Sequence, residues 1–256
     1  MRILISGSLA FDTIMDFPGV FTDHIIPEKL HTLSLSFLVE NVKRHFGGTA
    51  GNIAYSLALM GEHPVILSQL GVDAKAYQDH LSEYGISNES IRVVKEAQTA
   101  SAWIMTDRRD NQIASFYPGA MKYPATTKTQ WKKNRFTLAI CAPGSSSDRL
   151  ALAKWCRTTK TPWIFDPGQG LTDMSKAEIL SAMKGSLATI VNDYELDLLL
   201  KRLSVTKDQL WKLTAVLITT LGERGSVVEV KKEVNGERLL NKIGRASCRE
   251  RVCQYV

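Results

Sequence analysis

Short apolar runs alternate with segments of helical spacing along most of this chain. The runs are rich in Val, Ile and Leu, as strands buried on both faces are, and the segments between them repeat apolar residues every three or four positions. This alternation predicts an α/β fold with a mostly parallel central sheet flanked by helices. We expect strands at residues 1–10, 65–67, 91–94, 138–141, 163–165, 187–191 and 216–220, an antiparallel element at 225–230, and helices from about 51 and at 74–84, 148–158, 175–183, 194–203 and 207–213.

Two stretches break this alternation. Residues 13–46 contain short apolar pieces interrupted by proline and glycine, with strands expected at 33–39 and 42–46. Residues 99–105 and 112–117 form two β-type runs around a polar turn, the pattern of a hairpin. We expect these pieces to form a small β lid, built from about residues 13–46 and 98–120.

Residues 45–61 contain a glycine-rich turn that runs directly into a helix. Gly47 and Gly48 let the backbone bend sharply and let a ligand approach the main chain without meeting a Cβ. The helix that follows points free N–H groups and its positive dipole end at this turn. A polar or anionic ligand is therefore expected here.

Polar residues follow several of the expected strands. Because the carboxyl ends of parallel strands meet at one edge of a sheet, such residues are candidates for a common site. Each one alone is as readily a helix cap or turn residue, but several in one chain favour a site. The candidates are Asp12, Asp166, Asn192 with Glu195, and Thr220 with Gly222 and Gly225.

Size and charge restrict the class of protein. The chain has 256 residues, 44% of them apolar, and a formal charge of +6 from scattered Lys and Arg. The length and composition suit one globular domain, and the scattered charge argues against nucleic-acid binding. The N-terminal apolar run is too short for a signal peptide or a membrane span, so we expect no membrane partner and a cytoplasmic location. The four cysteines, expected to be reduced and structural, are Cys141, Cys156, Cys248 and Cys253.

Familiar catalytic motifs do not occur in this sequence. It has no Gly-x-x-x-x-Gly-Lys-Ser/Thr, no Gly-x-Gly-x-x-Gly and no His-Glu-x-x-His, which argues against Walker-type ATPases, Rossmann dehydrogenases and a zinc site. Ser145 follows an expected strand, as the nucleophile of a hydrolase would. Its segment lacks the second glycine of a nucleophile elbow, so a loop is favoured over that alternative.

The segment Phe46-Gly-Gly-Thr-Ala-Gly-Asn-Ile-Ala54 resembles the N-terminal signature of the ribokinase-like (PfkB) carbohydrate kinases. The chain is most similar to their bacterial adenosine-kinase-like branch, from residue 1 to about residue 240. Supporting segments occur in the family's order, at residues 5–12, 110–120, 165–169, 192–195 and 219–225.

This resemblance implies a kinase that moves the γ-phosphoryl group of ATP onto a primary hydroxyl of a nucleoside or sugar, adenosine first. It also implies roles for particular residues. Phe116 would be a lid aromatic against the base, although packing of the lid explains such an aromatic equally well. Asp12, Gly47, Gly48 and Asn52 would hold the ribose hydroxyls.

For the nucleotide, the resemblance implies ATP and Mg²⁺ as cofactors. Asn192 and Glu195 match the family's Asn-x-x-Glu motif, in which the glutamate organises Mg²⁺ through water. Asp166 would lie near the phosphates, and Thr220, Gly222 and Gly225 would form the nucleotide-side loop. Lid sheets pair between subunits in some members of the family, which leaves a homodimer open.

The end of the chain departs from the family. Its general base is an aspartate in a C-terminal Gly-Ala/Cys-Gly-Asp motif, and this sequence contains no such motif. Residues 243–252 instead resemble the translation of a sequencing-adapter oligonucleotide. We therefore expect a kinase domain at 1–242 that is incomplete at its C-terminus, a non-native tail at 243–256, and no catalysis by this chain. A ribokinase- or fructokinase-type sugar kinase and a non-catalytic nucleoside- or sugar-binding protein remain alternatives.

Overall fold

The computed structural model describes residues 1–25, 31–32, 34–127, 130–234 and 237–243. Apart from Ile243, the expected tail at 243–256 lies outside the described residues, and so do Cys248 and Cys253. Within them, no helix is both long and apolar enough to cross a membrane.

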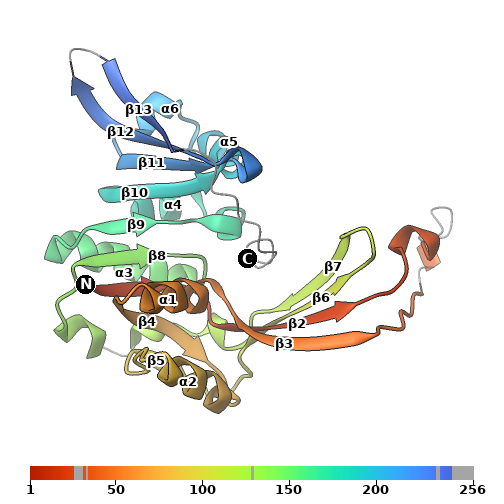
Figure 1. Ribbon diagram of the computed structural model, residues 1–256. Helices are drawn as coiled ribbons and strands as arrows, with labels where there is room; N and C mark the ends of the chain where they lie inside the picture. The colour runs from red at the N-terminus through yellow and green to blue at the C-terminus, as the bar shows by residue number, and fades with distance from the viewer. Residues whose placement is uncertain (26–30, 33, 128–129, 235–236, 244–256) are drawn as a thin grey trace.

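A nine-stranded sheet forms the body of the molecule in the described part of the chain (Figure 1). Its order is β13-β12-β11-β10-β9-β8-β1-β4-β5. The strands from β5 to β11 in this order run parallel, whereas β12 and β13 are antiparallel. The predicted α/β fold is therefore confirmed. The strands are β1 (Arg2–Ser6), β4 (His63–Leu70), β5 (Ile91–Val93), β8 (Leu138–Cys141), β9 (Trp163–Phe165), β10 (Ser186–Asn192), β11 (Thr214–Thr220), β12 (Ser226–Val234) and β13 (Glu237–Ile243).

Helices cover both faces of this sheet and bury two separate cores. Successive side chains of a strand point to opposite faces, so Ile3 and Ile5 of β1 join one core and Leu4 joins the other. The first core contains residues of α1 (Thr49–Leu59) and α2 (Ala74–Glu83). The second contains residues of α3 (Ser146–Thr159), α4 (Lys176–Met183), α5 (Asp193–Leu203) and α6 (Lys207–Leu210). Short 3₁₀ turns are η1 (Phe21–Asp23), η3 (Gly119–Lys122), η4 (Ala125–Thr127), η5 (Gln130–Lys133), η6 (Gly168–Leu171) and η7 (Gly222–Arg224).

A second sheet of four strands reaches away from the body (Figure 1). Its order is β3 (Asn41–Gly47), β2 (Ala10–Asp16), β6 (Ala100–Thr106) and β7 (Gln112–Tyr117). The predicted hairpin is confirmed as β6 and β7, which pair antiparallel. Because paired residues share a face, Asp12, Ala102 and Phe116 lie on one face of this sheet, and Phe11, Ser101 and Tyr117 lie on the other.

Two expectations about elements are wrong, and one strand was not predicted. The first strand ends at Ser6 and a new strand begins at Ala10, so Asp12 lies in the second sheet and not at the end of a central strand. Residues 34–39 form no strand, because the side chain of Phe37 packs against Phe17 and Phe21 instead of into a ladder. Strand β13 was not expected, since its sequence lacks an apolar alternation; it forms by pairing with β12.

Candidate active site

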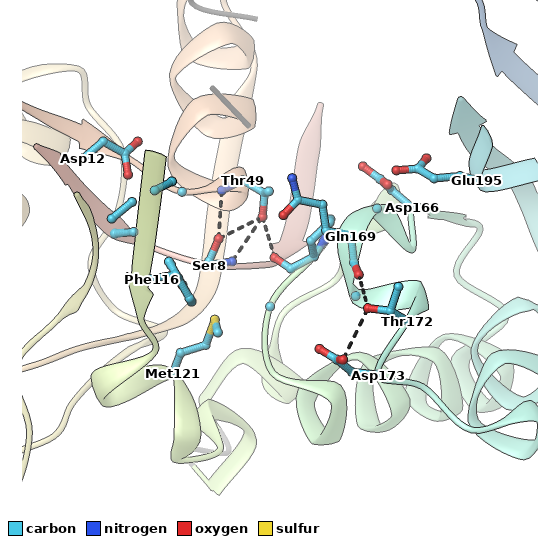
Figure 2. A pocket seen from close by; sticks show the side chains of 18 of the residues that line it. Ser8, Asp12, Thr49, Phe116, Met121, Asp166, Gln169, Thr172, Asp173 and Glu195 are labelled. Carbon is cyan, nitrogen blue, oxygen red and sulfur yellow. Dashed lines mark hydrogen bonds between the residues drawn. The ribbon is translucent and has the colours of Figure 1, made fainter. Parts of the chain in front are cut away.

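A cavity of about 750 Å³ opens between the central sheet and the second sheet, where β1, β8, β9, β10 and β11 end (Figure 2). Seven of the residues proposed from the sequence line it: Asp12, Gly48, Phe116, Asp166, Asn192, Glu195 and Thr220. Four others do not: Gly47, Asn52, Gly222 and Gly225. Their roles stay predictions.

The turn between β3 and α1 places two glycines against other parts of the chain. Gly48 has φ of 87°, and a Cβ there would lie 2.6 Å from the carbonyl oxygen of Ser8. A Cβ on Gly47 would collide with the carboxylate of Asp12. Both positions therefore require glycine, one for its backbone angle and one for a close approach. The carboxylate of Asp12 rests directly on the turn.

The start of α1 is tied to two neighbouring loops. Thr49 donates its hydroxyl to the carbonyl of Pro143 at 2.6 Å, and the N–H of Thr49 donates to Ser8 Oγ at 3.0 Å. The N–H of Ala50 donates to the Ser8 carbonyl at 3.0 Å. The expectation that this helix end offers free N–H groups to an anion is therefore wrong at its first two residues, because Ser8 already accepts from them.

The face of the second sheet that lines the cavity is mostly apolar around one carboxylate. Asp12 is partly buried, and burial raises its pKa, an effect that His45 opposes. Phe116 is 54% exposed and lies near Met121 of η3 in Figure 2. The other apolar lining residues of this sheet are Ala10, Ala102, Ile104 and Ala114.

Two carboxylates face each other at the opposite side of the cavity (Figure 2). Burial, and secondly repulsion by Glu195, raise the pKa of Asp166 to about 7. Glu195 also belongs to a capping box at the start of α5: its N–H donates to Asn192 Oδ1 at 2.7 Å, and its Oε2 accepts from the Asn192 N–H at 2.9 Å. The capping box fixes Glu195 at the cavity through its Oε2.

The structure adds lining residues that sequence reasoning missed. Arg149 is only 1% exposed, and its guanidinium donates to the carbonyl of Pro167 at 3.2 Å and to Ser146 Oγ at 3.3 Å. It thereby holds the loop that follows Asp166. Arg149 lies in the first turn of α3, where no sequence motif marks it, so only its burial in the structure identifies it. The other missed polar lining residues include Ser8, Thr49, Gln112, Gln169, Thr172 and Asp173.

Two further expectations concern nucleophiles. Cys141 and Cys156 are free and buried, as expected of reduced cysteines that pack in a core. Ser145 immediately precedes α3, and its Oγ lies 2.8 Å from Ser147 Oγ. It is the loop and helix-start residue that its sequence favoured.

Comparison with known proteins assigns the family. Residues 12–238 match the model of the pfkB family carbohydrate kinases. A nucleoside kinase of Methanocaldococcus jannaschii is 28% identical over 211 residues, which cover 80% of this chain and 67% of that protein.

Solved structures give the same assignment. The nucleoside kinase of Burkholderia thailandensis in complex with inosine is 34% identical, with a TM-score of 0.80 over 94% of this chain and 75% of that one. The same enzyme in complex with ADP-inosine is 36% identical, with a TM-score of 0.77 over 94% of this chain and 74% of that one. This chain therefore belongs to the pfkB family of carbohydrate kinases, within the phosphotransferase class of carbohydrate and nucleoside kinases.

Proposed function

We propose that this protein is a nucleoside kinase with adenosine as its first candidate substrate and ATP as the phosphoryl donor. The observation that carries the proposal is the chemical difference between the two ends of one cavity. One end presents a carboxylate on a glycine turn, which suits the hydroxyls of a sugar. The other end presents two carboxylates, an amide and a hydroxyl at strand ends, which suit a nucleotide with its cation.

At the first end, Asp12 accepts hydrogen bonds from ligand hydroxyls, and the backbone at Gly48 allows the sugar to lie close to the main chain. Asn52 lies on α1 outside the cavity lining, so we assign the main polar contact to Asp12.

Between the two ends, the cavity offers an apolar wall. It is formed by Ala102, Ile104, Ala114, Phe116 and Met121. A flat heterocycle buries apolar area against such a wall, whereas a bare sugar does not. This favours a nucleoside over ribose or fructose. The inosine complex of the Burkholderia enzyme supports the same class of ligand.

At the second end, Asp166 and Glu195 fit Mg²⁺. Their repulsion costs free energy that a divalent cation removes, and carboxylate oxygens are hard ligands. No group of three or more potential metal ligands occurs among the described residues, so these two carboxylates would hold the ion together with water and phosphate oxygens. The ion supplies charge neutralisation to the phosphates. Thr220 lies at the end of β11 and lines the cavity, and we assign it the donation of its hydroxyl to a phosphate oxygen.

In the reaction, the primary hydroxyl oxygen forms a bond to the γ-phosphorus, the bond from that phosphorus to ADP breaks, and the hydroxyl proton passes to a base. The aspartate motif that supplies this base in the family is not in this sequence. We therefore propose that residues 243–256 are non-native and that this chain binds its substrates without turning them over. Resequencing the codons after Leu240 and assaying the restored protein tests this; turnover there excludes the binding-only alternative.

Calorimetric titration of this chain with adenosine, inosine, ribose and fructose tests the ligand class. We expect the nucleosides to bind more tightly than the free sugars. Replacing Phe116 by Ala should weaken nucleoside binding by about tenfold, the scale of a lost aromatic contact, and leave ribose unaffected. Tyr117→Ala is the matched control, because Tyr117 is the next residue on β7 and lies on the opposite face. Equal affinity for ribose and adenosine would contradict the nucleoside proposal.

A further inference from the structure

Tyr77 lies directly behind the glycine turn, outside the cavity. It belongs to α2, and its side chain is 1% exposed. Its ring packs against Phe11 and Phe46 of the second sheet, with centroid distances of 5.6 Å and 5.2 Å. The sequence gives it no motif, and in its helix it reads as one more core aromatic.

The hydroxyl of Tyr77 is held between two glycines. It donates to the carbonyl oxygen of Gly47 at 2.6 Å in a buried environment. On its other side is Gly51 of α1, where a Cβ would collide with the Tyr77 oxygen. Burial, and secondly the charge of Asp12, raise the pKa of Tyr77 well above its usual value, so the hydroxyl keeps its proton and remains a donor.

Gly47 connects this hydroxyl to the cavity. Its carbonyl accepts from Tyr77, and its α-carbon lies against the Asp12 carboxylate so closely that a side chain has no room. A displacement of Gly47 by a few tenths of an ångström therefore changes the space in which Asp12 sits.

We propose that Tyr77 is a positioning residue, which fixes the Gly47 carbonyl and thereby holds the turn and the Asp12 carboxylate in the geometry that receives ligand hydroxyls. The inference rests on the proposed function of Asp12. It concerns the hydroxyl alone, because a phenylalanine ring would keep the packing against Phe11 and Phe46. Without the hydroxyl, the Gly47 carbonyl would lose a buried hydrogen bond of 2.6 Å, and the turn would be less firmly held.

Tyr77→Phe tests the proposal in the chain as it is. Titration calorimetry with adenosine and with 2′,3′-dideoxyadenosine separates contacts to the sugar hydroxyls from all other contacts. We expect Tyr77→Phe to weaken adenosine about tenfold, the scale of one buried hydrogen bond, and to change dideoxyadenosine binding less than about twofold. Tyr55→Phe is the control, because it removes the hydroxyl of a half-exposed tyrosine on α1 that does not line the cavity.

Gly51→Ala places a methyl group against the same hydroxyl and should show the same selective loss of adenosine binding. It decides the question if Tyr77→Phe unfolds. Equal losses for both ligands would mean a structural role only and would overturn the proposal, as would unchanged binding of adenosine. If the unsubstituted protein binds neither ligand, the proposed function fails and this inference fails with it. If it binds both and Tyr77→Phe does not discriminate, the inference fails alone.

Discussion

The two ends of the cavity are built in opposite ways. At the turn end, neutral groups of the protein satisfy one another: Ser8 and Thr49 bond to each other and to Pro143, and Tyr77 bonds to Gly47. At the strand end, Asp166 and Glu195 are like charges that face one another, and the pKa of Asp166 is raised to about 7.

The turn end is therefore preorganised for a ligand, whereas the strand end holds two carboxylates whose repulsion is not balanced. A turn whose hydrogen bonds are already made needs little rearrangement to receive a sugar, so substitutions there should act on ligand affinity. A pair of carboxylates in mutual repulsion is stabilised when a proton or a cation arrives, so substitutions there should act on pH dependence and on the response to divalent ions.

The largest expected effect is at the turn end. Asp12→Asn removes a carboxylate that, under the proposed function, accepts from two ligand hydroxyls. It should weaken adenosine binding roughly 10²- to 10³-fold, since each charge-assisted hydrogen bond contributes about 1.5–3 kcal/mol. The ligand-free protein should lose no stability, because burial disfavours the charged form of Asp12. Calorimetry and urea unfolding measure the two quantities.

Asp16→Asn is the matched control for that change. Asp16 lies on the same strand and the same face of the second sheet but does not line the cavity. If Asp12→Asn binds adenosine as tightly as the unsubstituted protein, Asp12 does not contact the sugar. The contrast between the two ends of the cavity would then be wrong.

The second effect is a pH dependence of stability at the strand end. The pKa of Asp166 is about 7 in the folded protein against 3.8 for the unperturbed group, so between these values the folded state holds more protons than the unfolded one. Stability therefore falls as pH rises from about 4 to about 7. By the size of the pKa shift, the unsubstituted protein should lose roughly 2–4 kcal/mol of its free energy of unfolding over this range. Asp166→Asn should not show this loss.

Urea unfolding in magnesium-free buffer at about pH 4.5 and about pH 8 measures this slope. Asp173→Asn, at another lining position of the same cavity, is the control. If the free energy of unfolding changes with pH equally in the unsubstituted protein and in Asp166→Asn, the pKa of Asp166 is not raised by burial and by Glu195.

The strand end was predictable because it follows from topology. Parallel strands deliver their carboxyl ends to one edge, so Asp166, Asn192 and Thr220 could be grouped from the apolar runs that precede them. The parallel direction of these strands followed from the same alternation, whereas their order in the sheet came only from the structure. Strand β13 could not be predicted, because pairing with β12 specifies it and its own pattern does not.

The turn end was predictable only in part. The glycines identified it, but the acceptors of the helix N–H groups come from Ser8, 41 residues away from Thr49, and Tyr77 and Gly47 are 30 residues apart. Such contacts depend on how α2 and the second sheet pack around the turn, and no local period encodes them. Arg149 was not predicted for the same reason, because its burial depends on the loop after Asp166.

The smallest expected effect tests whether the strand end is completed by a cation. With ADP present, millimolar Mg²⁺ should stabilise the unsubstituted protein by about 1 kcal/mol, as binding at a few times its Kd does, and raise its thermal midpoint. Glu195→Gln should abolish this gain. Gln serves at this position of a capping box as Glu does, so α5 keeps its start and a loss of the Mg²⁺ response reports the charge.

Glu178→Gln makes the same change in a second Glu capping box, at the start of α4, which does not line the cavity. It should keep the full Mg²⁺ response. If Glu195→Gln also keeps it, the two carboxylates do not form the cation site. The repulsion between Asp166 and Glu195 would then be relieved by protonation of Asp166 alone, and the strand end would differ from the turn end in its pH dependence but not in its need for a metal.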